Sequence, residues 1–121
     1  MDGNPIDSRV IAQLRELQDP DEPDLVQSLI ALFFTEGQER IDRILAAARA
    51  GDAATIERAA HSLKGSAGTI GARRLSAACA ALEAAAPGDA ADHVNTVTRE
   101  YAAAVDALRA LQDWKTGRLE D

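Results

Sequence analysis

Apolar residues recur at intervals of three and four along most of the chain, which is the spacing of one buried face on an α-helix. Proline and glycine divide this pattern into five segments. The segments lie between Asp7 and Asp19, from near Pro23 to about Ala50, from about Ala53 to about Ile70, between Gly71 and Pro87, and around Val94 to Leu111. Each apolar stripe is narrow and each connection is short, which is typical of an antiparallel up-down bundle.

The ends of the segments carry the residues that usually begin and end helices. Asp7 is suited to cap the first segment, with Ile6 and Ile11 placed to pack across the cap. Gly51 and Asp52 form a glycine stop followed by the next N-cap. These signals support helices at the predicted places.

The amino-acid composition indicates the same fold class. Alanine occurs 26 times among 121 residues, and aromatic residues make up only 3% of the chain. Alanine has the highest helix propensity and contributes little to the packing of a sheet. The sequence therefore predicts an all-α protein, an antiparallel up-down four-helix bundle with an additional short N-terminal helix. We expect a single domain over residues 1–121, with its core at about 6–115.

Net charge and cysteine content exclude several classes of function. The net charge is −7, which argues against general binding to nucleic acid or to an anionic membrane. The beginning of the chain lacks the basic-then-apolar order of a signal peptide, and the apolar run Leu29–Phe34 is too short to span a bilayer. The single cysteine, Cys79, forms no intramolecular disulfide or cysteine-based metal cluster. We expect a cytoplasmic monomer without metal or cofactor.

The stretch from His61 to Gly68 carries the candidate chemistry. At about 100° per residue, His61 lies roughly 130° from the centre of the apolar stripe, so it is expected to face solvent. Gly65 and Gly68 lie on the same outward face. Two glycines inside a helix cost about 2 kcal/mol relative to alanine, out of a typical stability of about 5–15 kcal/mol. In an alanine-rich chain, this pattern indicates that bulk has been removed so that another molecule can approach the imidazole.

Lys64 is one turn from His61 and is expected to add positive charge beside the ring. Such a charge favours the neutral imidazole and stabilises an anion formed on it. An exposed neutral imidazole with open space and a cation beside it is suited to accept a phosphoryl group. Each of these residues alone is most often an ordinary surface residue, so the prediction depends on the combined pattern.

The run from Ala60 to Gly68, followed by Gly71-Ala72 and by Leu82-Glu83, resembles the histidine phosphotransfer (HPt) domain. The likeness extends from about Ile6 to about Leu111. It implies a four-helix bundle in a two-component phosphorelay, in which a histidine accepts a phosphoryl group from an aspartyl phosphate on one receiver domain and passes it to another. By this resemblance His61 is the phosphoacceptor, and Lys64 and Gly65 match positions for charge compensation and close docking.

The resemblance also implies the partners and the source of the metal. Response-regulator receiver domains and a hybrid histidine kinase are the expected partners, and Mg²⁺ is expected in the receiver only. The protein is then a phosphoryl carrier rather than an enzyme. Two alternatives remain open: a non-catalytic helical bundle that only binds a partner, and the phosphoacceptor domain of a chemotaxis-type histidine kinase.

Folding the helices back on one another predicts the neighbours of His61. Reflection about Gly71 places Glu83 at the level of His61, where the related family often has glutamine; an ionised Glu83 would hold a proton on one ring nitrogen. Reflection about Gly51 places the second helix beside His61. The residues expected to form the docking surface for a receiver are Phe34, Gly37, Gln38, Ser62 and Gly68.

Overall fold

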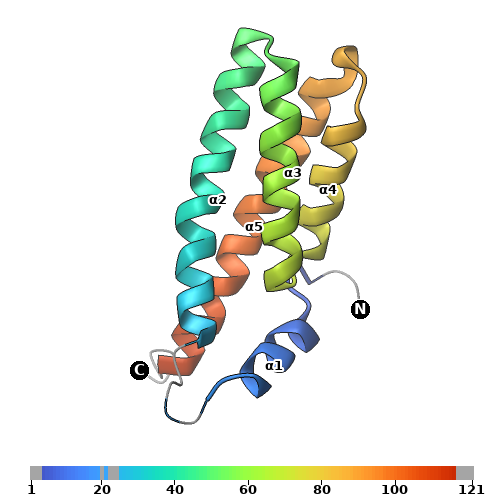
Figure 1. The fold of residues 1–121 in the computed structure, drawn as a ribbon. Coiled ribbons are helices and arrows are strands. Elements are labelled where there is room, and N and C mark those ends of the chain that lie inside the picture. The colour runs from blue at the N-terminus through green and yellow to red at the C-terminus, as the bar shows by residue number, and fades with distance from the viewer. Residues whose placement is uncertain (1–3, 20, 22–24, 117–121) are drawn as a thin grey trace.

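The computed structural model describes residues 4–19, 21 and 25–116 of the chain, apart from the side chains of residues 87 and 113–116. Its elements are α1 (Ser8–Glu16), α2 (Leu25–Ala50), α3 (Ala53–Ile70), α4 (Arg73–Ala84), the short 3₁₀ helix η1 (Pro87–Asp89) and α5 (Ala90–Thr116). Figure 1 shows four long helices running alternately up and down, with α1 at one end. The predicted all-α class and bundle are confirmed. The predicted start of the second helix near Pro23 lies outside the described residues.

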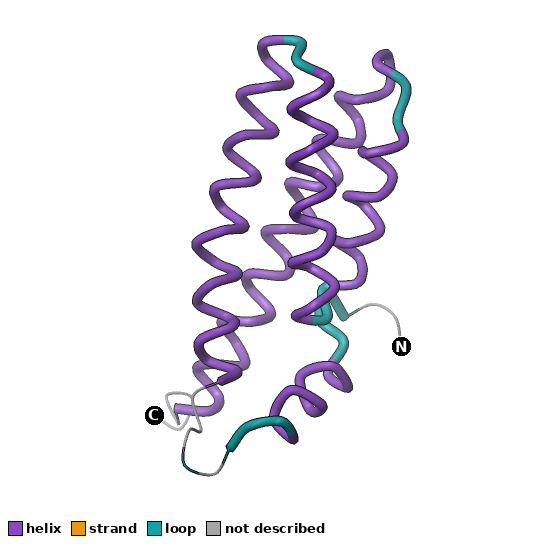
Figure 2. The backbone as a smooth tube through the Cα atoms, in the orientation of Figure 1, coloured by secondary structure: helices purple, strands orange, loops and turns teal. Residues whose placement is uncertain are grey.

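The four long helices form a closed ring of neighbours. Helix α2 packs against α3, α3 against α4, α4 against α5, and α5 against α2. The connections between them are short, as the loop segments in Figure 2 show. Each helix therefore buries a face in the centre of the ring and leaves the opposite face accessible. In the described residues, no helix has the length and apolar content that crossing a membrane requires.

Helix α1 is attached to the turn between α3 and α4. The Asp7 carboxylate caps α1 by accepting from the Arg9 N–H, and the Asp7 N–H donates to the Gly71 carbonyl at 2.8 Å. Gly71 ends α3 with a φ of 83°, which favours glycine, and a Cβ there would lie 2.9 Å from the Val10 Cβ. The turn therefore needs glycine both for its backbone conformation and for contact with α1.

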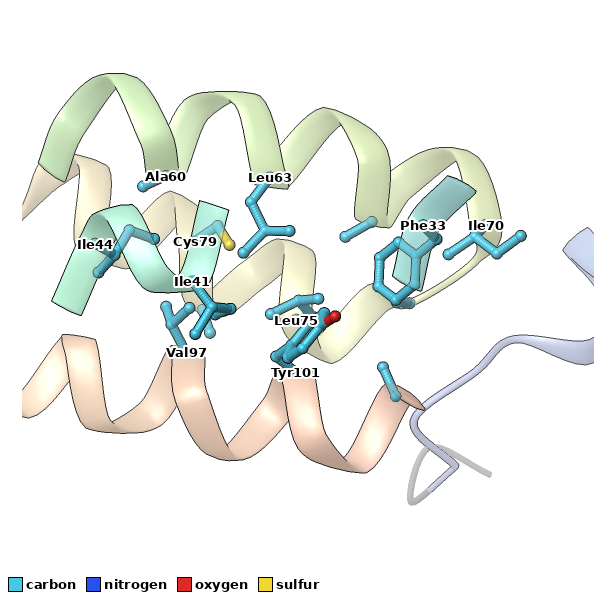
Figure 3. Packing of buried hydrophobic residues seen from close by; sticks show 14 of the residues in the cluster. Phe33, Ile41, Ile44, Ala60, Leu63, Ile70, Leu75, Cys79, Val97 and Tyr101 are labelled. Carbon is cyan, nitrogen blue, oxygen red and sulfur yellow. The ribbon is translucent and has the colours of Figure 1, made fainter. Parts of the chain in front are cut away.

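The core occupies the centre of the bundle, where all four long helices contribute side chains (Figure 3). Helix α3 contributes Ala60, Leu63 and Ala67, each of which is fully buried. Two alanines facing the core allow α3 to lie close to its neighbours. This buried stripe fixes the rotation of α3 about its own axis, and thereby determines which of its residues face solvent.

Candidate functional site

His61 lies in the middle of α3 on the side facing away from the core. Its neighbours along the chain, Ala60 and Leu63, are fully buried, whereas the His61 side chain is 69% exposed. The outward orientation predicted from the helical period is therefore confirmed. An imidazole in this position is held by a rigid helix but is accessible to another macromolecule.

Glu83 on α4 contacts both His61 and Lys64. Its Oε2 lies 2.7 Å from Nδ1 of His61, and its Oε1 lies 2.7 Å from Nζ of Lys64. The Glu83 side chain is only 20% exposed, so it lies mostly between α3 and α4. The level predicted for Glu83 is confirmed. Lys64 differs from the expectation, because its ammonium group pairs with Glu83 and not with the ring.

The charge on Glu83 determines the proton position on the imidazole. Hydrogen bonds from Lys64 and then from His61 lower the pKa of the Glu83 carboxyl, so it is ionised at neutral pH. An ionised carboxylate accepts hydrogen bonds and donates none. We therefore assign the ring proton to Nδ1, which donates to Glu83. The lone pair of the other nitrogen, Nε2, is then the nucleophilic position of His61.

Gly65 and Gly68 leave open space on the same face of α3. Both residues are exposed, and a Cβ built at either position would meet nothing within 4 Å. Packing inside the molecule therefore does not require glycine at these positions. Because glycine destabilises a helix by about 0.8–1.0 kcal/mol relative to alanine, clearance for an external partner is the remaining physical reason. The predicted exposure of both glycines is confirmed.

Three of the residues expected to form the docking surface lie on a different face. Gly37 is buried, and a Cβ there would lie 2.6 Å from Cε1 of Tyr101 on α5. Phe34 and Gln38 line a groove of about 580 Å³ between α2 and α5. The guanidinium of Arg109 lies 5.4 Å from the Phe34 ring centroid. The expectation for these residues was wrong because reflection about a turn predicts the level along the bundle and not the rotation about the helix axis.

The part of α2 beside His61 carries residues that the sequence argument missed. Nε of Arg40 donates to Oγ of Ser62 at 2.9 Å, so Ser62 is half-buried between the two helices. Farther along α2, the Leu32 side chain is 51% exposed. Leu32 borders a groove of about 150 Å³ between α2 and α3, together with Ser66 and Thr69. A large apolar side chain off the buried stripe of α2 was the available signal for this groove.

Cys79 lies in the core close to this site but is unsuited to nucleophilic chemistry. Its side chain is fully buried, and burial, followed by the nearby Glu83 charge, raises the pKa of the thiol to about 12. The thiolate is the reactive form of cysteine, and it is almost unpopulated at neutral pH. His61 is therefore the nucleophile that this site presents.

A rigid antiparallel bundle that exposes one oriented imidazole is the arrangement of a phosphohistidine carrier. The family model described as "Hpt domain" matches residues 28–114 of this chain. The crystal structure of histidine-containing phosphotransfer protein B (HptB) from Pseudomonas aeruginosa PAO1 is similar, with a TM-score of 0.77 and 29% sequence identity. That likeness covers 91% of this chain and 96% of the HptB chain. No curated protein sequence matched the chain.

The chain belongs to the Hpt domain family. Its function is histidine phosphotransfer in a two-component phosphorelay. The resemblance found in the residues around His61 is thus confirmed at the level of the family.

Proposed function

We propose that His61 is the residue that carries the phosphoryl group. The observation that supports this assignment is the 2.7 Å contact between Nδ1 of the exposed His61 ring and the Glu83 carboxylate. This contact holds the ring in one orientation and leaves Nε2 free to react. Glu83 is a positioning residue in this proposal, since it acts through the imidazole.

The transfer is a displacement at phosphorus. The Nε2 lone pair of His61 forms a bond to the phosphorus of an aspartyl phosphate on a receiver domain. The bond between that phosphorus and the aspartate oxygen breaks, and its electron pair remains on the carboxylate. The reverse reaction delivers the phosphoryl group to the aspartate of a second receiver.

Mg²⁺ in the receiver would supply most of the charge stabilisation during transfer. The carboxylate beside His61 is already engaged, with one oxygen on the ring and the other on Lys64. We therefore assign no metal or other cofactor to this chain. It acts as a carrier for the phosphoryl group, and the receivers contribute the remaining catalytic groups.

We assign the docking surface to the exposed face of α3 and the groove beside it on α2. Gly65 and Gly68 provide clearance next to His61. Leu32, Ser66 and Thr69 border the adjoining groove. An exposed leucine beside small residues suits an apolar contact at the centre of an interface. The partners on this surface are receiver domains, including that of a hybrid kinase, and the carrier acts as a monomer.

The decisive experiment is transfer from a set of pre-phosphorylated receiver domains to the purified protein. The wild type is compared with His61→Gln, and His93→Gln serves as the matched control on α5. We expect acid-labile, base-stable label on the wild type and on His93→Gln, and none on His61→Gln. Binding of a receiver without any transfer would contradict the proposal and support a module that only binds its partner.

A further inference from the structure

The contact between His61 and Glu83 also bears on the phosphorylated state. We propose that Glu83, anchored by Lys64, keeps a proton on Nδ1 of the phosphorylated ring and thereby makes the phosphoryl group short-lived. This inference rests on the proposed role of His61. It adds that Glu83 regulates how long the carrier remains charged.

The proton matters because of the group that leaves when the N–P bond breaks. Water, or the carboxylate of a receiver, attacks the phosphorus, and the electron pair of the N–P bond returns to Nε2. If Nδ1 carries a proton, the leaving group is neutral imidazole. If Nδ1 has lost its proton, the leaving group is imidazolate, a much stronger base and a poorer leaving group. Holding the Nδ1 proton therefore speeds loss of the phosphoryl group.

The geometry favours Glu83 as the residue that holds this proton. Its Oε2 lies 2.7 Å from Nδ1, and a hydrogen bond from an imidazolium to a carboxylate is stronger than one between neutral groups. Lys64 occupies Oε1, which fixes the carboxylate in place. Attachment of the phosphoryl group to Nε2 leaves the Nδ1 side of the ring, and so this contact, unchanged.

Other charged groups lie around the ring on the elements packed against this face. They are Glu83 from α4, Lys64, Glu57 and Arg58 from α3, and Arg40 from α2. Arg40 donates to Ser62 and pairs with Glu39, and Arg58 donates to Thr55. Glu57 is exposed one turn before His61, so it has the same charge as Glu83 and a different position. It therefore provides the matched control for removing a nearby negative charge.

The experiment measures the lifetime of the phosphoryl group without any receiver. The protein is labelled with phosphoramidate, a small donor from which ammonia leaves as the N–P bond to His61 forms. Loss of the label to water is then followed from about pH 5 to about pH 9. His61→Gln, labelled in parallel, gives the contribution of His93, which is subtracted. Circular dichroism confirms that each variant is folded.

We expect Glu83→Gln and Glu83→Ala to retain the label about three- to tenfold longer than the wild type at about pH 8. Glu57→Gln should match the wild type. At about pH 5 the lifetimes should converge, because bulk acid then protonates Nδ1 in every variant. Equal lifetimes at about pH 8, or faster loss from both Glu83 variants, would overturn the inference. Because neither labelling nor loss uses a receiver, a failure of transfer between proteins would be seen separately.

Discussion

The guanidinium of Arg40 on α2 donates to the hydroxyl of Ser62 on α3 at 2.9 Å, one residue after His61. The two residues are equally far from Gly51, since 51 − 40 and 62 − 51 both equal 11. This hydrogen bond therefore lies at the level that folding about Gly51 predicts. It also identifies the face of α2 that meets α3, which is the face that carries Leu32.

Leu32→Ser tests the assigned docking surface. The Leu32 side chain is half exposed and borders the α2–α3 groove, so a receiver would bury its remaining apolar surface. We expect the Kd for a receiver to rise about tenfold, because that burial contributes about 1.4 kcal/mol. Titration calorimetry measures the effect. Leu17→Ser, at an exposed leucine after α1, is the matched control, and equal weakening by both variants would remove Leu32 from the interface.

Gly65→Ala should affect stability and transfer in opposite directions. A Cβ at this position meets no other atom within 4 Å, so the helix gains about 0.8–1.0 kcal/mol of stability. The same methyl group occupies the space through which a receiver approaches His61, so phosphotransfer should become slower, and Gly65→Leu should slow it further. Urea denaturation and the transfer rate measure the two effects. An unchanged transfer rate in both variants would show that the glycine has no role in docking.

Gly37→Ala should destabilise the bundle without acting at the site. The new Cβ would lie 2.6 Å from Cε1 of Tyr101, whose hydroxyl donates to the Phe34 carbonyl and whose ring centroid lies 5.7 Å from that of Phe33. Because the tyrosine is held at both ends, it has little room to move. After the gain in helix propensity, we expect a net loss of about 1–2 kcal/mol.

Chemical denaturation of Gly37→Ala in the wild-type and Tyr101→Leu backgrounds measures the coupling. The loss should shrink in the second background, where the ring is absent. The same loss in both backgrounds would mean that the close contact with the tyrosine is not its cause.

The stability difference between wild type and Glu83→Gln should depend on pH. Lys64 and His61 lower the pKa of Glu83 in the folded protein relative to its ordinary value of 4.5. A lowered folded-state pKa contributes stability that is fully present above the unfolded value and is lost as the pH falls through the folded value. The wild type should therefore unfold at a higher temperature than Glu83→Gln at neutral pH. Thermal melts that show a constant difference down to the lowest pH would contradict the assignment.

Much of the site was predictable because helical periodicity fixes each residue relative to the core. The stripe containing Ala60 and Leu63 determines that His61 faces outward, and the structure agrees. The level of Glu83 follows from the short turn at Gly71, since two antiparallel helices joined by such a turn run back at equal distances from it. Both predictions need only the geometry of one helix and one turn.

The sequence by itself determined the fold class, the exposure of His61 and the open space at Gly65, because each follows from spacing within one helix. Tertiary structure decided which neighbour each side chain meets. It directs Gly37 toward Tyr101, Arg40 toward Ser62 and Lys64 toward Glu83. Periodicity tells which face of a helix is buried, but the rotation of one helix against another depends on how all their side chains interlock. Only the packed bundle supplies that information.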